Sequence, residues 1–489
     1  MRGRFLLLLL ILFARPVCAS ESSLVDLRLV DAAQQRDWSS IQRLLSANAD
    51  ISITQPDGVM ALHWATYHQH HPTVERLVAA GADVNAKTRY QVTPLTIAAR
   101  LGSAEILAAL LAAGGEVDTK LPTGQTLLMT AARAGYVDVV RVLIDAGCQV
   151  DVTERKGQTA LMWAAANGHA KIVQMLLDAG ADRDRKVKSG YNAYFFAARQ
   201  GQLRTVETLI YAGVEVNQTM QEAKGNGRNA RKDTSALMLA IESGHFQLAL
   251  RLIELGADSN DQRSGYTPLH AVTWVRKTDR GDGVSGDPPP RGSGRVTSLQ
   301  FVRKLVAAGA DVNLQLAQGK GGKAKLHHKG ATPFLLAAKT ADLPLLKLLL
   351  ELGADPHLTN TTNTNALMAT MGIGVVAVGE EPGTVAEVQA VGQWLLDEIP
   401  GGGIDINAKD NNGETAMHGA AYRNYPEAVE FLAARGADPA IWNVKNKYGW
   451  TPTMIAQGKR PGSLKISPET IAALEVAMEY EPDVAPKDK

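Results

Sequence analysis

The chain has 489 residues, of which 45% are hydrophobic and 21% charged, with 51 basic and 50 acidic residues. This length exceeds that of one compact domain, so several domains or an array of repeats is expected. The formal net charge of +1 gives no support for a nucleic-acid coat or an acidic tail, which a strong overall charge would indicate.

Residues 1–19 are predicted to be a secretory signal peptide. Arginines precede an apolar run from Phe5 to Phe13, and cleavage is expected after Ala19. The run is too short for a membrane-spanning helix, which needs roughly 20 apolar residues. Cleavage would remove three arginines, changing the formal charge from +1 to −2, and would leave Cys148 as the one cysteine, unable to form an intramolecular disulfide. We therefore expect an exported bacterial protein, periplasmic or secreted, without a membrane span.

A period of 33 residues governs the rest of the chain. The residues that recur at this step are Ala65, Ala98, Ala131, Ala164 and Ala197; Leu77, Leu110, Leu143, Leu176 and Leu209; and Gly81, Gly114, Gly147, Gly180 and Gly213. Asn48 stands one period before Gly81, and Asn tolerates the left-handed backbone that closes helices. This predicts a degenerate first unit over residues 20–56.

Each unit combines signals for two short helices. A turn is followed by a residue type that caps helix N-termini, and in several units proline comes next, at the first helical position, where the missing N–H costs nothing. The predicted caps are Thr93, Thr126, Thr159, Asn192, Ser235, Thr267, Thr332, Asn365, Thr415 and Thr451, with Met60 as the exception. A second helix then shows an apolar stripe at i, i+3 and i+4, as at Leu107, Leu110 and Leu111, and ends in Gly-Ala-Asp.

These residues resemble the ankyrin repeat. The resemblance rests on "TPLHAV" at 267–272, "AAANGHAKIVQMLLDAGAD" at 164–182, and "AAGADVN" at 79–85 and 307–313. It covers nearly the whole chain after the signal peptide. It implies an all-α fold in which helix-turn-helix pairs stack into a curved solenoid, with hairpin-like loops projecting to one side.

We expect about eleven full repeats with capping units at both ends. Each repeat is identified by one anchor residue in its first helix: residues 62, 95, 128, 161, 194, 237, 269, 334, 367, 417 and 453. The period is regular over 57–220 and interrupted over 221–449, a C-terminal capping repeat covers 450–480, and 481–489 is a tail. The interruptions, predicted as surface loops, are 221–233, 277–298, 314–330, 374–387 and 398–404.

Four histidines in "ALHWATYHQHHP", residues 61–72, suggest a metal or acid–base site. The period argues against it, because one slot holds His63, His270 and His418, and another holds His70, His169 and His245. Both slots are predicted to serve the scaffold, with hydrogen bonds to the backbone near the turns. A zinc site needs three or four convergent ligands, so we predict no metal, cofactor or catalytic residue. The alternative is an enzyme or metal-dependent protein that uses His68, His71, His327 and His328.

The predicted partner-binding residues are those that the stack does not need: loop tips and the exposed end of each first helix. They lie at −6, −5, −3, +5 and +6 from an anchor. Over the 35 such positions of the seven repeats from anchor 95 to anchor 334 there are twelve cations and one acid, Glu242. The predicted residues are Tyr67, His68, Arg89, Tyr90, Arg100, Arg133, Arg155, Lys156, Lys188, Tyr191, Arg199, Arg231, Lys232, Arg263, Tyr266, Trp274, Lys329 and Lys339, joined by His328.

The sequence thus predicts a monomeric, non-enzymatic scaffold whose basic concave groove binds a protein with an acidic surface. Two alternatives stay open: binding of a polyanion such as a polysaccharide or nucleic acid, of which nucleic acid is not expected, and a secreted effector that acts on host proteins.

Overall fold

The computed structural model describes residues 26–221, 232–277, 289–319, 325–376, 378–379, 382–460 and 465–479. Those residues contain helices and no β-strand, with two isolated bridges at Lys120–Thr126 and Thr219–Ser235. The predicted all-α fold is confirmed. The predicted signal peptide, the tail 481–489, Arg231 and most of the first insertion lie outside the described residues. None of the described helices is both long and apolar enough to cross a bilayer.

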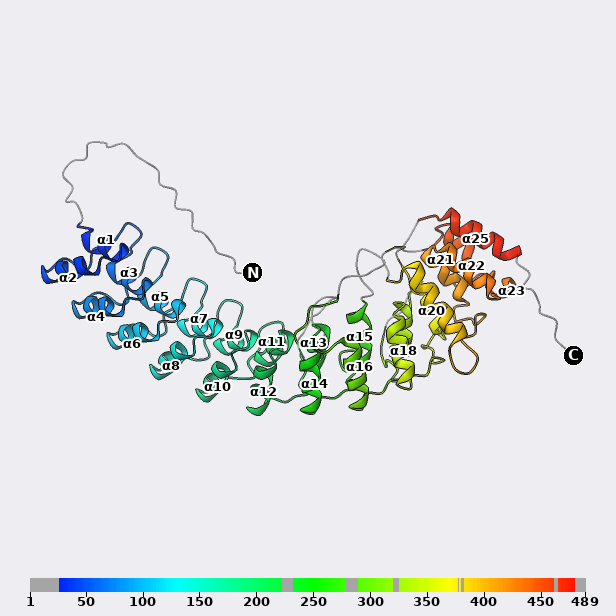
Figure 1. Cartoon of the computed structure of the whole chain (residues 1–489), viewed down its shortest axis with the longest axis horizontal. Coiled ribbons are helices and arrows are strands. Elements are labelled where there is room, and N and C mark those ends of the chain that lie inside the picture. Colours follow the sequence, from blue (N-terminus) through cyan, green and yellow to red (C-terminus); the bar gives the residue numbers. More distant parts are fainter. Residues whose placement is uncertain are drawn as a thin grey trace, which may run out of the picture. The chain divides into compact units, whose positions relative to one another are not determined.

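The helices follow one another as pairs, visible in chain order in Figure 1. The pairs are α1 (Arg28–Gln34) and α2 (Trp38–Ser46), α3 (Ala61–Tyr67) and α4 (His71–Ala79), α5 (Pro94–Leu101) and α6 (Ala104–Ala112), α7 (Leu127–Ala134) and α8 (Val137–Asp145), α9 (Ala160–Ala166) and α10 (Ala170–Asp178), and α11 (Ala193–Arg199) and α12 (Leu203–Tyr211). They continue with α13 (Ala236–Glu242) and α14 (Phe246–Glu254), α15 (Pro268–Arg276) and α16 (Ser298–Ala307), α17 (Pro333–Lys339) and α18 (Leu343–Glu351), α19 (Ala366–Met371) and α20 (Val385–Asp397), α21 (Ala416–Arg423) and α22 (Pro426–Ala434), and α24 (Pro452–Ala456) and α25 (Pro468–Glu479). The short α23 (Pro439–Trp442) lies between the last two pairs.

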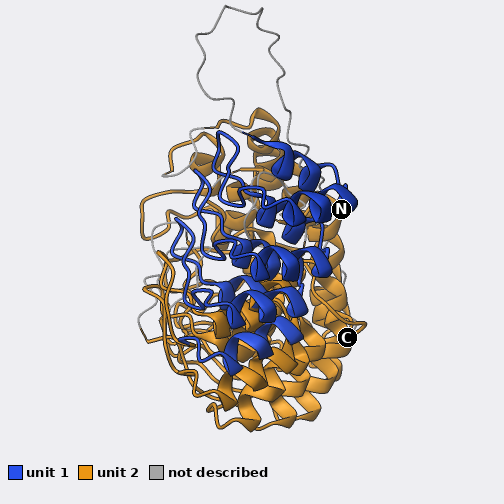
Figure 2. Ribbon diagram, turned by 90° about the vertical axis from the view of Figure 1, so that its left-hand side faces the viewer, with its two compact units in different colours: residues 1–131, 138–149 blue, residues 132–137, 150–489 orange. Residues whose placement is uncertain are grey.

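The chain divides into two compact units, coloured separately in Figure 2. Unit 1 comprises residues 1–131 and 138–149, and unit 2 comprises 132–137 and 150–489. In unit 1 the first helices α1, α3 and α5 pack in series, and so do the second helices α2, α4 and α6. In unit 2 the first helices α9, α11, α13, α15, α17, α19, α21 and α24 pack in series. Within each unit, each of these repeats therefore contacts its neighbours in the chain.

The first helices begin where the sequence predicts. Nine of the ten predicted cap residues accept a hydrogen bond from the backbone N–H three residues later, as Thr93 Oγ1 does from Thr96 N at 3.2 Å. The exception is Thr415, whose hydroxyl lies 3.1 Å from His418 Nδ1. The recurring alanines are buried, and their small side chains let neighbouring first helices approach closely. Asn48 has a φ of 55°, the left-handed conformation predicted from its place in the period.

Asparagine side chains connect successive repeats at the ends of the second helices. In unit 1, Asn85 Nδ2 donates to Gly114 O at 3.0 Å, and its Oδ1 accepts from Glu116 N at 2.8 Å. In unit 2, Asn217, Asn260 and Asn313 make the same pair of bonds to the next repeat. Each of these amides satisfies backbone groups that would otherwise lack a partner, which fixes the register between the repeats it joins.

Part of the insertion predicted at 374–387 is buried rather than exposed. Val375, Pro382 and Gly383 are buried, and two buried arginines donate to carbonyls of this segment. Arg423 Nη1 lies 3.0 Å from Pro382 O, and Arg460 Nη1 lies 2.8 Å from Val375 O. In addition, α16 and α20 begin inside the ranges predicted for insertions, at residues 298 and 385.

Candidate partner-binding surface

Two histidines of the 61–72 cluster belong to the scaffold. His63 is 2% exposed; its Nδ1 accepts from Met60 N at 3.2 Å and its Nε2 lies 3.2 Å from Ala86 O. Burial lowers the pKa of His63. The ring of His70 stacks on Trp38 with centroids 4.3 Å apart, and burial lowers its pKa as well. His63 thus makes the predicted backbone bonds, whereas His70 is held by aromatic stacking and by a hydrogen bond of 2.8 Å between its Nδ1 and Thr73 Oγ1.

The two histidines outside the period point to different neighbours. His68 Nδ1 accepts a hydrogen bond from Arg36 Nε at 3.0 Å, and its Nε2 donates to Gln34 O at 3.1 Å. His71 Nε2 lies 3.8 Å from Glu75 on the next turn of α4. Within the described residues, no group of three or more His, Cys, Asp or Glu side chains has the geometry to hold a metal ion.

The slot of His63 has the same structural role in unit 2. His270 is fully buried, and its Nε2 lies 2.9 Å from Ala331 O. His418 is also fully buried, and its Nδ1 accepts from Thr415 N at 3.3 Å. Burial lowers the pKa of both histidines to about 4, so both are neutral at physiological pH. The predicted scaffold role of this slot is confirmed.

In unit 2, the ends of successive first helices are tied together by side chains at the start of the next second helix. Three carbonyls at +5 positions accept these bonds: Arg133 O from His169 Nε2 at 3.2 Å, Ala166 O from Gln202 Nε2 at 3.3 Å, and Arg199 O from His245 Nε2 at 3.1 Å. Gly135 lies against the His169 ring that makes the first of these bonds. Its φ is 85°, and a Cβ at this residue would lie 2.6 Å from the ring. We call these three bonds the carbonyl ladder.

Two exposed arginines of the carbonyl ladder lie over aromatic rings. The Arg133 guanidinium is 4.8 Å from the centroid of the Trp163 ring. The Arg199 guanidinium is 5.7 Å from the Tyr191 ring, and its Nη1 donates to the Tyr191 hydroxyl at 3.3 Å. Cation–π stacking restricts the orientation of a guanidinium without consuming its hydrogen-bond donors.

Tip and helix-end positions meet in two repeats of unit 2. Tyr191 at −3 contacts Arg199 at +5, and Tyr266 at −3 packs edge-on against Trp274 at +5 with centroids 4.8 Å apart. The Tyr266 hydroxyl also lies 3.3 Å from His328 Nδ1. We use the name first-helix surface, within each unit, for the predicted residues at −6, −5, −3, +5 and +6.

Most predicted residues of the first-helix surface are exposed. In unit 1 these are Tyr67, Arg89, Tyr90 and Arg100, while His68 is half-buried. In unit 2 they are Arg133, Arg155, Lys156, Lys188, Arg199, Lys232, Arg263 and Lys329, while Tyr266, Trp274 and Lys339 are half-buried.

Two predicted residues serve the fold more than the surface. Tyr191 is only 7% exposed, and burial raises the pKa of its hydroxyl. Its buried ring and hydroxyl therefore hold the exposed Arg199 guanidinium in place. Arg263 forms an ion pair with the buried Asp261 at 2.8 Å and donates to Asn217 O at 3.0 Å, so its guanidinium is largely occupied inside the protein.

Sequence reasoning missed the +2 position. Trp64, Ile97, Thr130, Trp163 and Phe196 occupy it in five successive repeats, and all five are half-buried. From anchor 237 to anchor 367 the residues at +2 are buried. The large apolar side chains that recur at this step in four of the five repeats were the available signal, but apolar character alone does not distinguish a surface position from a core position.

Acidic side chains in the Gly-Ala-Asp elements have structural roles. Asp83, Asp258 and Asp311 each accept from the backbone N–H two residues later at 2.8 Å, which stabilises the turn after the second helix.

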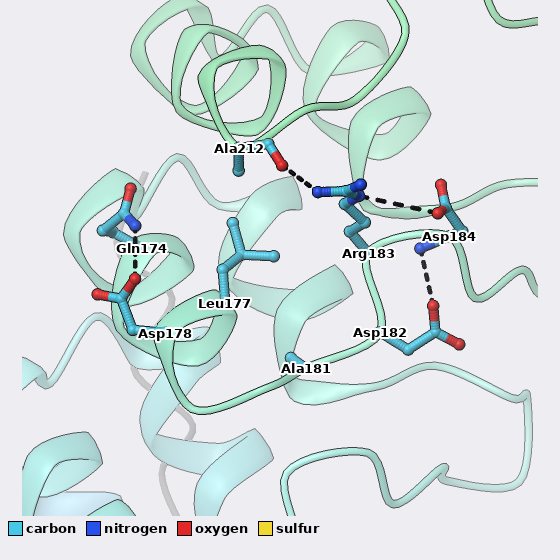
Figure 3. Close-up of a pocket in the computed structure, with 8 residues that line it drawn as sticks. All are labelled: Gln174, Leu177, Asp178, Ala181, Asp182, Arg183, Asp184 and Ala212. Carbon is cyan, nitrogen blue, oxygen red and sulfur yellow. Dashed lines mark hydrogen bonds and ion pairs between the residues drawn. The ribbon is translucent and has the colours of Figure 1, made fainter.

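Figure 3 shows a pocket of about 440 Å³ in unit 2, beside the end of α10. It is lined by Gln174, Leu177, Asp178, Ala181, Asp182, Arg183, Asp184 and Ala212. Arg183 donates to Ala212 O and lies 3.8 Å from Asp184, so it takes the bridging role that asparagine has elsewhere. The three aspartates and the open rim distinguish this pocket from the cationic first-helix surface.

Comparison with known proteins places the sequence in a family. The model "Ankyrin repeats (3 copies)" matches residues 29–121, 108–187, 128–220, 194–278 and 386–466, and the model "Ankyrin repeat" matches 329–361. The crystal structure of the human ASB11 ankyrin repeat domain is similar over 54% of this chain and 100% of that domain, with 22% sequence identity and a TM-score of 0.41. Since the family models match well over half of the sequence, the chain belongs to the ankyrin-repeat family.

Proposed function

We propose that this protein is a non-enzymatic scaffold that binds an acidic protein partner through the first-helix surface. Ankyrin repeats imply protein partners, and proteins built from them are typically scaffolds without catalytic activity. The proposal adds the chemistry of the partner, which the family alone does not specify.

The contact between tip and helix-end residues is the observation that carries the proposal. Tyr191 touches Arg199 and Tyr266 touches Trp274, so the −3 and +5 positions lie next to each other within those repeats of unit 2, with Tyr191 buried beside the exposed Arg199. The cations on it are mostly exposed, and Arg and aromatic residues are the types enriched where partners bind most tightly. An excess of one sign of charge also speeds the encounter with an oppositely charged partner.

Charge reversal tests the proposal. Changing Arg100, Arg133 and Arg199 together to Glu should reduce capture of the partner, identified by crosslinking in the native compartment and mass spectrometry, by at least tenfold. The melting temperature should stay within a few degrees, because exposed substitutions usually change stability by less than about 0.5 kcal/mol each. The matched control changes Lys171, Arg204 and Lys304, exposed on second helices, to Glu. Equal loss of capture in both triple variants would contradict the proposal.

The second candidate function is binding of a polyanion, favoured by the same excess of cations. Affinity for a polyanion falls steeply with salt because binding releases condensed counterions, whereas a protein interface with apolar contacts tolerates salt better. Titrating the captured ligand between about 50 and 200 mM salt separates the two: a loss of about 10³-fold or more indicates a polyanion.

We also propose that the chain is exported after cleavage behind Ala19 and acts as a monomer. N-terminal sequencing of the secreted protein and light scattering test these two points. The secreted effector acting on host proteins is a special case of the scaffold function, and the identity of the crosslinked partner decides it.

A further inference from the structure

We infer that Arg133 and Arg199 form a matched pair of clamps for two carboxylates spaced six residues apart in an extended peptide. This inference rests on the proposed function and deepens it, since it names the form of the acidic partner. All residues that carry it belong to unit 2.

The backbone positions of the two clamps are fixed relative to each other. The carbonyl ladder joins Arg133 to the repeat of His169, Ala166 to that of Gln202, and Arg199 to that of His245. Both arginines thus leave the scaffold from the same +5 position, one on each side of Ala166. Because the backbone at both arginines is already fixed by these hydrogen bonds, little conformational entropy is lost when a partner binds to them.

Each guanidinium is also oriented. Trp163 lies under Arg133 and Tyr191 under Arg199, at 4.8 and 5.7 Å. Both arginines are exposed, and neither has an ion-pair partner within the described residues. Arg199 Nη1 already donates to the Tyr191 hydroxyl at 3.3 Å. The remaining N–H groups of Arg199 and those of Arg133 are the donors that match the two oxygens of a carboxylate.

The +5 position of the repeat between the clamps is neutral. It is occupied by Ala166, so the row of +5 side chains has no cation between Arg133 and Arg199, and the half-buried Trp163 lies at +2 of the same repeat; the cations of this repeat, Arg155 and Lys156, belong to its loop tip. An apolar side chain of the peptide fits this position. In the repeat after that of Arg199, the +5 residue is Glu242, which is acidic. The row of +5 arginines therefore does not continue beyond Arg199.

The spacing of the repeats sets the spacing of the acids. Arg133 and Arg199 are 66 residues apart, which is two periods of 33. Packed helices are separated by about 10 Å, so two repeats advance about 20 Å. An extended peptide advances about 3.3 Å per residue, so about six residues separate the two acids.

Fluorescence anisotropy with synthetic peptides tests the inference. The probe is a labelled twelve-residue Gly/Ser/Thr peptide with two Glu six residues apart and Leu two residues after the first Glu, so that all three side chains lie on one face of the extended peptide; the controls have the same composition with the Glu residues four or eight apart. At about 150 mM salt, we expect the six-apart peptide to bind the full chain at least tenfold more tightly than either control.

Variants separate the clamps from general electrostatics. Arg133→Lys and Arg199→Lys keep the charge but lose the planar fork, so each should weaken the six-apart peptide at least fivefold. Trp163→Ala should do the same, and Arg204→Glu, on the surface of α12, should leave affinity unchanged. Circular dichroism confirms that each variant is folded.

The outcomes distinguish the two proposals. Equal affinity for all three spacings, or wild-type affinity in both Lys variants, would overturn the clamps. If Arg133→Glu and Arg199→Glu then still weaken capture of the native partner, the proposed function stands without them. If these reversals and Arg204→Glu have equal effects on that capture, both proposals fail.

Discussion

At the scale of single residues, the C-terminal repeats bury an unusual carboxyl group. Glu414 is 2% exposed, and its Oε1 accepts from the Tyr422 hydroxyl at 2.7 Å and from Asn446 Nδ2 at 2.9 Å. Burial, reinforced by the nearby carboxylate of Asp410, raises the pKa of Glu414 to about 7. The Arg460 guanidinium lies 5.0 Å from the centroid of the Tyr422 ring and donates to two backbone carbonyls rather than to Glu414.

This pKa predicts that Glu414 loses its stabilising contribution as the pH rises towards neutrality. The folded state holds the Glu414 proton up to about pH 7, whereas the unfolded state releases it near the usual value of 4.5. Raising the pH from about 4.5 to 7 should therefore remove about 2–3 kcal/mol of this group's contribution to the folding free energy, and little changes above pH 7. The buried histidines, whose pKa values are lowered, act in the opposite direction below about pH 6.5, so the wild type has to be compared with a variant that retains them. Thermal melts between about pH 5 and 7 should show the wild type losing stability relative to Glu414→Gln; parallel profiles of the two proteins would contradict the assignment.

At the scale of helices and turns, the carbonyl ladder depends on glycine. Gly135 has a positive φ and the His169 ring lies against its Cα, so a side chain there meets both a strained backbone and a steric clash. Gly147, also at positive φ, has open space where a Cβ would be. The two glycines therefore differ in steric contact while sharing backbone strain.

Substitution by alanine should separate these effects. Gly147→Ala should destabilise the chain by about 1 kcal/mol, the usual cost of a left-handed alanine. Gly135→Ala should cost more, about 2–3 kcal/mol, since the His169 ring must also move and its bond to Arg133 O is lost. Chemical denaturation measures both. An equal effect of the two substitutions would show that the ring contact contributes nothing.

Features that depend on residues close together in the sequence, or one period apart, were mostly predicted, whereas contacts between residues far apart in the sequence were not. Caps and histidine slots follow from residues three or four apart, or one period apart, and so could be inferred from the pattern. The burial of Val375 and Pro382 could not, because it depends on Arg423 and Arg460, more than 40 and 80 residues away. The stacking of Arg133 on Trp163 was missed for a related reason: a tryptophan at +2 has the same apolar character in the core as on a binding surface.

At the scale of the whole molecule, stability is a sum over neighbours. Helices pack in series within each unit, and the second-helix ends are connected by single amides such as Asn217 and Asn260. In such arrays, unfolding is governed by individual repeats and their interfaces, and a long array need not melt in one step.

We therefore expect the chain to unfold in more than one transition. Leu143→Ala in unit 1 and Leu209→Ala in unit 2 each leave a cavity at a fully buried site, costing about 2–5 kcal/mol. Each substitution should lower the midpoint of a different transition in urea, followed by circular dichroism. A single transition shifted equally by both would show instead that the array behaves as one cooperative block.

The carbonyl ladder has a consequence for how the protein can change over generations. The hydrogen bonds of the carbonyl ladder are accepted by the main-chain oxygens of the +5 residues, and every amino acid has such an oxygen. The side chains at those positions are therefore open to replacement without loosening the stack, and the arginines at 133 and 199 and the alanine at 166 already show two different choices. Selection could therefore change the partner preference one repeat at a time, by substitutions at +5, while the hydrogen bonds that hold the repeats together stay the same.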